Sequence, residues 1–172
     1  MADPSDNAAA ERGRAIYADY IREQLAGQEA RKTSLEQRGL SVVTTSGALV
    51  TLLFGLTTLA VDREAFTLPS ASRALLVVAI VFFVVAAVAA IVTNMPLSYE
   101  GVTPSALREA VKDRWEDGEA TAAEMTSLTR IKVLESARRR NNIKAIALFA
   151  GMVSEIVAVA LVGTAVAFVV WT

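Results

Sequence analysis

Three apolar segments, each long enough to cross a bilayer as a helix, constrain this chain more than any other feature of its sequence. They cover residues 40–61, 74–94 and 145–171, and the first runs for 22 residues without a charge. The hydrocarbon core of a bilayer needs roughly 20 residues of apolar helix. The third segment is longer than this, so we expect it to tilt or protrude. The sequence therefore predicts an all-α integral membrane protein with three transmembrane helices.

The placement of lysine and arginine predicts the orientation of these helices. Residues 1–39 carry six of these cations and residues 95–144 carry nine, whereas the connection at 62–73 carries two. Positively charged segments stay on the cytoplasmic side of a membrane. We therefore expect a cytoplasmic N-terminus, a short external loop at 62–73, and a C-terminus outside.

The first cytoplasmic segment, residues 1–39, is predicted to be mostly helical. Residues 8–38 lack proline and are rich in good helix formers. Tyr17, Ile21 and Leu25 recur at helical spacing and predict a thin apolar face. Residues 3–6, in front of this helix, are expected to be disordered.

The second cytoplasmic segment, residues 95–144, is predicted to form a helical hairpin. Thr103 as N-cap and Pro104 at the first helical position predict a short helix with Leu107, Val111 and Trp115 on one face. This helix is expected to end at 117–118.

The second helix of the hairpin is predicted to begin at Thr121, which forms a capping box with Glu124. No proline follows, and the only glycines lie within the apolar segment. We therefore expect one continuous helix of about 50 residues that runs into the third span.

Within the first span, small and hydroxyl-bearing residues share one face. At 100° per residue they fall within about 120° of arc. We call this face the polar stripe, and it consists of Ser41, Thr44, Gly47, Ala48, Thr51, Gly55 and Thr58. Its glycines favour close helix packing through a small-xxx-small pattern. Alternatively, its hydroxyls line a water-filled pore, where they replace part of the hydration shell of an ion.

Glu155 is the one charge inside the third span and is predicted to lie near the membrane midplane. An ionisable residue at that depth is costly and indicates a functional site. With Ser154 beside it, Glu155 is a candidate for an acidic ring in a pore or for the coupling carboxylate of a small proton-coupled transporter. The alternative is a protonated glutamic acid that hydrogen-bonds to a threonine of the first span and serves packing only.

The second span lacks polar residues until Thr93, so we expect it at the periphery, facing lipid. Three helices with only two polar faces cannot enclose a conduit. A pore therefore requires several copies, a tetramer or larger, around a symmetry axis. The competing interpretation is a non-conducting scaffold or assembly protein in which the stripe only packs helices.

A basic cluster lies at the cytoplasmic base of the third span. It is typical of a positive-inside anchor at the lipid headgroups. Alternatively it forms an anion or nucleotide site, with the candidate residues Arg130, Lys132, Arg138, Arg139, Arg140 and Lys144.

Several kinds of chemistry are excluded because the chain has no cysteine and no histidine. Thiol and imidazole catalysis, disulfides and Cys/His metal sites all need these side chains. We expect no enzymatic activity, no metal and no cofactor.

Together, the helix containing Leu128, Thr129, Arg130 and Ile131 and the Ala137–Arg140 run that leads directly into a span resemble the small membrane effectors of bacterial anti-phage defence systems. The resemblance implies a pore-forming protein of the bacterial inner membrane that responds to a cytoplasmic nucleotide or oligonucleotide ligand. It implies no enzymatic residue, and no binding to duplex DNA is expected.

Overall fold

The computed structural model describes residues 4–61, 69–96, 103–114 and 117–171. The described residues form four α-helices and no strand, which confirms the all-α prediction. Three of these helices, α1, α2 and α4, are long and apolar enough to cross a membrane. Trp115 and residue 3 lie outside the described residues, so their predicted roles are not addressed by the structure.

α1 spans Pro4–Val61, so the polar N-terminal segment and the first apolar span form one helix of 58 residues. The expected disorder at residues 4–6 is wrong, because these residues belong to its first turn. Proline suits this position, since its fixed φ fits a helix and its missing N–H would have had no partner there.

α2 spans Ser70–Asn94 and begins four residues before the apolar segment that predicted it. Pro69 precedes it with extended backbone angles, φ −55° and ψ 142°. The extra turn contains Ser72, which is buried and donates a hydrogen bond of 3.3 Å to the carbonyl of Ala165.

α3 spans Pro104–Arg114, and Thr103 caps it as predicted. The Thr103 hydroxyl accepts a hydrogen bond from the backbone N–H of Ala106 at 3.3 Å. Every residue of α3 is exposed.

α4 spans Glu119–Trp171, 53 residues without a break, which confirms the predicted continuous helix. It begins two residues earlier than predicted, since the N–H of Ala122 already bonds to the carbonyl of Gly118. Thr121 therefore lies inside the first turn, and the predicted capping box is wrong.

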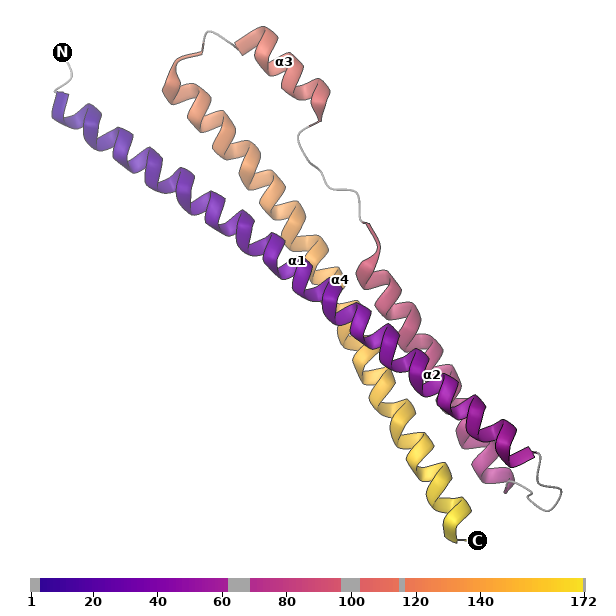
Figure 1. The fold of residues 1–172 in the computed structure, drawn as a ribbon. Coiled ribbons are helices and arrows are strands. Elements are labelled where there is room, and N and C mark those ends of the chain that lie inside the picture. The colour runs from indigo at the N-terminus through magenta and orange to yellow at the C-terminus, as the bar shows by residue number, and fades with distance from the viewer. Residues whose placement is uncertain (1–3, 62–68, 97–102, 115–116, 172) are drawn as a thin grey trace. The chain divides into compact units, whose positions relative to one another are not determined.

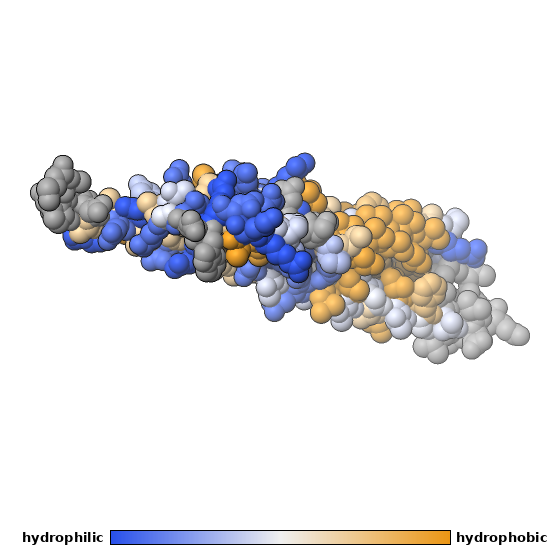
Figure 2. All heavy atoms as spheres, turned by 90° about the horizontal axis from the view of Figure 1, so that it is seen from above, coloured by the Kyte–Doolittle hydropathy of each residue, from blue (hydrophilic) through white to orange (hydrophobic). Residues whose placement is uncertain are grey.

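The helices divide into two compact units. The apolar unit comprises Ser34–Met95 and Ile143–Thr172, and the polar unit comprises Met1–Thr33 and Pro96–Asn142. In the apolar unit, α1, α2 and α4 lie side by side (Figure 1), and apolar side chains cover much of the face seen in Figure 2. In the polar unit, α3 folds back beside the first turns of α4 (Figure 1).

The core of the apolar unit consists mainly of small side chains. Val42 of α1 packs with Leu148 of α4 and with Ala86 and Ala90 of α2. A glycine permits a close approach of α4 to α2, because a Cβ on Gly151 would lie 3.3 Å from the Ala86 carbonyl oxygen and from the Ala89 Cβ. Such small-residue contacts are typical of membrane helix packing.

The second span is therefore not a purely lipid-facing helix, as was expected from its lack of polar residues. One of its faces is buried against α1 and α4 at intervals of four and three residues, namely Ala79, Phe83, Ala86, Ala90 and Thr93. This spacing averages 3.5 residues, as in coiled-coil packing. Alanine is apolar enough for lipid and small enough for helix contact, so hydropathy alone did not distinguish the two environments.

Candidate functional site

The polar stripe of α1 lies on the exposed surface of the apolar unit. All seven of its residues are exposed, whereas the opposite face of α1 contributes Gly39, Val42 and Ser46 to the interior. Open space surrounds Gly47 and Gly55, since a Cβ added to either would meet nothing within 4 Å. Within the described part of the apolar unit, the stripe is thus not used to pack α1 against α2 or α4.

The stripe hydroxyls bond to their own helix. Each donates to a carbonyl one turn earlier in α1. The distances are 3.2 Å from Ser41 to Gln37, 3.0 Å from Thr44 to Leu40, 2.9 Å from Thr51 to Gly47 and 2.8 Å from Thr58 to Gly55. Each hydroxyl hydrogen is used in one of these bonds. The oxygen lone pairs remain, so each hydroxyl can only accept hydrogen bonds from its surroundings.

Glu155 lies at the contact between α1 and α4. Its side chain is half-buried, and its Oε1 accepts a hydrogen bond of 3.3 Å from the Ser46 hydroxyl. Neighbouring Ser154 is buried. The partner of Glu155 on the first span is thus a serine of the packed face and not a threonine of the stripe.

The structure does not bring the polar stripe and Glu155 together within one chain. Ser46 lies about 160° around α1 from the centre of the stripe, at 100° per residue. Glu155, bonded to Ser46, is therefore on the packed side of α1 while the stripe is on the exposed side. A wall shared by the stripe and Glu155 is not formed by a single copy.

Lys144 forms an ion pair inside the apolar unit, so its charge is not available to the predicted anion site. Its ammonium lies 2.6 Å from Oε1 of Glu36, and only 2% of the side chain is exposed. Thr93 of α2 hydrogen-bonds to the Lys144 carbonyl at 3.5 Å. Lys144 thus joins α1 to α4, while its backbone contacts α2.

The arginines of the cluster belong to the polar unit and have different surroundings. Arg138 donates to the side-chain carbonyl of Gln24 at 3.1 Å, and Arg139 is exposed. Arg140 is half-buried and has an interaction partner of its own. Arg130 and Lys132 line a groove between α3 and α4. Of the predicted anion-binding residues in the polar unit, Arg130 and Lys132 thus line the same groove.

Asn141 is a second buried polar residue that links α1 to α4. It is 1% exposed, and its Nδ2 donates to the backbone carbonyl of Gln28 at 2.8 Å and to the Gln28 side chain at 3.1 Å. The sequence analysis did not predict this role of Asn141 in helix pairing. A 3.5-residue repeat through Ala137, Asn141, Lys144 and Leu148 is the signal that indicates this role.

These contacts show that α1 and α4 run parallel in each unit. In the polar unit, contacts advance from Gln24 with Arg138 to Gln28 with Asn141. In the apolar unit, they advance from Glu36 with Lys144 to Ser46 with Glu155. Polar pairs at helix contacts fix the register of the two helices.

No group of three or more acidic residues within the described part of the chain is arranged to hold a metal ion. Comparison of the chain with protein-family models, with curated protein sequences and with solved structures gives no match. The function is therefore inferred from the residues and their geometry.

Proposed function

We propose that this protein is a homo-oligomeric membrane channel whose copies meet along the polar stripe of α1. The observation that supports this proposal is the position of the stripe. It is exposed along the whole span, while the opposite face of α1 is occupied by α2 and α4 of the same chain. Contact with a second copy of the chain would let this small, hydroxyl-bearing face pack against protein and not against lipid.

The proposed orientation places the N-terminus and residues 95–144 in the cytoplasm. The excess of lysine and arginine in these two segments supports this assignment. In a bacterial cell, the protein would reside in the inner membrane with its C-terminus outside.

Cation conduction follows from the hydrogen bonds of the stripe. The hydrogens of Ser41, Thr44, Thr51 and Thr58 are bonded to α1 itself. Around a symmetry axis, the remaining oxygen lone pairs of four or more copies would form rings of acceptors. Such rings replace part of the hydration shell of a cation.

In this proposal Glu155 links α4 to α1 by a hydrogen bond and is not part of an acidic ring. Its hydrogen bond to Ser46 links α4 to the helix that carries the stripe. α4 is unbroken from Glu119 to Trp171. A cytoplasmic signal acting on the first half of α4 therefore has a continuous helix through which to act on Glu155 and gate the channel.

A non-conducting assembly protein is the second candidate, and the open space around Gly47 and Gly55 favours it. These glycines form a small-xxx-small face that allows the backbones of two helices to approach closely. Both candidates require association through the stripe, and conduction distinguishes them. The resemblance to anti-phage effectors adds a setting, in which opening of the channel damages the membrane during infection.

The two candidates are tested with leucine substitutions at three exposed glycines. Gly47→Leu and Gly55→Leu each add a bulky side chain to the surface of the stripe. Gly163→Leu on α4 is the matched control, because all three positions have open space around them. Native mass spectrometry should count four or more subunits for the wild type and for Gly163→Leu, and fewer for the two stripe variants. A monomeric wild type, or equal subunit counts in all three variants, contradicts association through the stripe.

Conduction is then measured in planar bilayers. Cation current is expected from the wild type and from Gly163→Leu, and its loss from Gly47→Leu and Gly55→Leu. An intact oligomer without current under any applied voltage or cytoplasmic ligand supports the assembly protein over the channel.

A further inference from the structure

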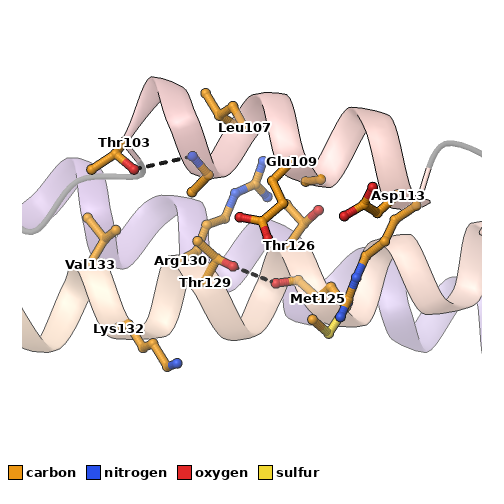
Figure 3. Close-up of a pocket in the computed structure, with 13 residues that line it drawn as sticks. Thr103, Leu107, Glu109, Asp113, Met125, Thr126, Thr129, Arg130, Lys132 and Val133 are labelled. Atoms are coloured by element: carbon orange, nitrogen blue, oxygen red, sulfur yellow. Dashed lines mark hydrogen bonds between the residues drawn. The ribbon is translucent and has the colours of Figure 1, made fainter.

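The polar unit contains an open groove between α3 and α4 with a volume of about 880 Å³. This volume lies within the range of small-molecule sites, roughly 300–1,000 Å³. Thr103 marks one end of the groove on α3, and Figure 3 shows it above Val133 of α4. The other end lies at Asp113 and Met125 (Figure 3).

Much of the groove lining is apolar. Ala106, Leu107 and Ala110 contribute from α3, and Met125 and Val133 contribute from α4. Leu107 remains 54% exposed, so α3 does not close against α4. The groove thus offers apolar surface that a ligand could cover.

The α4 hydroxyls in the groove are already satisfied. Thr126 donates to the Ala122 carbonyl at 2.8 Å, and Thr129 donates to the Met125 carbonyl at 2.8 Å (Figure 3). Neither retains a hydrogen to offer a ligand. The donors left to the groove on α4 are therefore cationic side chains.

Arg130 is the cation best placed to bind a ligand. Its side chain is half-buried and reaches from α4 toward α3, near Glu109 (Figure 3). Arg130 forms no ion pair with any carboxylate of the described residues. A guanidinium is always charged and presents five donors that suit carboxylate and phosphate groups.

We propose that this groove binds a small amphipathic anion. The phosphate or carboxylate group of the ligand would bind Arg130, and its apolar part would cover Leu107 and Met125. Glu109, on the opposite wall, weakens anion binding by repulsion. The proposal concerns binding alone, and it holds whether or not the protein conducts.

The neighbouring cation provides a matched control. Lys132 also lines the groove, but Figure 3 shows its ammonium directed away from α3. Substitution of Lys132 by glutamine removes the same charge as substitution of Arg130, two residues away on the same helix. A difference between the two variants therefore reports position in the groove and not net charge.

Phenyl phosphate is the probe, with inorganic phosphate and phenol for comparison, in a saturation-transfer NMR titration of the full chain in phosphatidylcholine nanodiscs. We expect phenyl phosphate to bind more tightly than either fragment. Arg130→Gln should weaken its binding about tenfold or more, as expected for the loss of a charged hydrogen bond. Lys132→Gln should change it less than twofold, and Glu109→Gln should strengthen it.

The proposal is overturned if the wild type does not bind phenyl phosphate, or if either fragment binds as tightly. Equal losses in Arg130→Gln and Lys132→Gln overturn it as well, because they indicate non-specific attraction. Nanodiscs that contain phosphatidylglycerol identify the source of the ligand. Competition with phenyl phosphate assigns the site to an anionic lipid, and unchanged binding assigns it to a soluble anion.

Discussion

Lys144 of α4 and Glu36 of α1 form an ion pair with 2.6 Å between the ammonium nitrogen and Oε1, and the lysine is almost completely buried. A buried cation is costly unless it is paired. The pair therefore does more than add one contact, since it makes any other register of α1 against α4 unfavourable. The nearby Ser46–Glu155 hydrogen bond fixes the same register.

Replacing Glu36 by glutamine should destabilise the apolar unit, because the charge of Lys144 then lacks its counter-ion. Glu36 is about one-third exposed, so we expect a loss of about 1–3 kcal/mol in the free energy of unfolding. Unfolding by SDS measures this loss. The double variant Glu36→Leu/Lys144→Met should recover most of it, since no charge remains unpaired. The account is contradicted if the double variant loses more free energy of unfolding than Glu36→Leu and Lys144→Met lose when their separate losses are added.

Removal of the Ser46 hydroxyl should weaken the α1–α4 contact. Ser46→Ala leaves Glu155 without its donor, and we expect a loss of about 0.6 kcal/mol, the average for hydrogen bonds between membrane helices, and of no more than about 1.7 kcal/mol. Thr164→Ala is the control, because its hydroxyl bonds to its own helix, at the Ala160 carbonyl. Equal effects of the two substitutions on SDS unfolding would show that the Ser46–Glu155 bond adds no stability.

Leucine at Gly151 should disrupt the contact between α2 and α4. Its Cβ alone would lie 3.3 Å from the Ala86 carbonyl oxygen, so the helices must separate, at a cost of about 1–3 kcal/mol. Gly163→Leu, in open space on the same helix, should leave the free energy of unfolding unchanged or raise it. If both variants unfold at the same SDS concentration, the close approach at Gly151 is not present in the membrane.

A carboxylate at position 141 should separate α1 from α4 in the polar unit. Asn141 donates two hydrogen bonds to Gln28, and aspartate has no hydrogen to donate when ionised. Asn141→Asp should increase hydrogen exchange at the backbone amides near Gln28. The exposed neighbour provides the control, and Asn142→Asp should leave exchange there unchanged.

The structural features that were predicted correctly depend on runs of consecutive residues. Those that were missed depend on which face of a helix packs against its neighbours. Unbroken apolar runs and the absence of proline predicted three spans and the long α4 helix. The packed face of α1 was missed because Val42 and its neighbours are as apolar as lipid-facing residues. Ser46, a hydroxyl-bearing residue on that apolar face, is the local signal that could have identified it.

The same reasoning applies to the candidate site. The stripe is recognisable in the sequence, because hydroxyls and glycines are distinctive in an apolar run. Its partner was not predictable, since small residues suit lipid, a second helix and a pore alike. Lys144 was grouped with Arg138–Arg140 by sequence proximity, whereas its burial against Glu36 arises from a residue more than one hundred positions away.

Accessibility of a single cysteine in the stripe tests the central claim most directly. The chain has no cysteine, so Thr51→Cys introduces a unique thiol, and Ile156→Cys on the exposed face of α4 is the control. The account predicts that a charged, membrane-impermeant methanethiosulfonate reagent modifies Thr51→Cys in proteoliposomes and blocks its current, while Ile156→Cys stays unmodified in lipid. Equal protection of both thiols in an intact oligomer would contradict it, because the stripe would then be a dry helix contact.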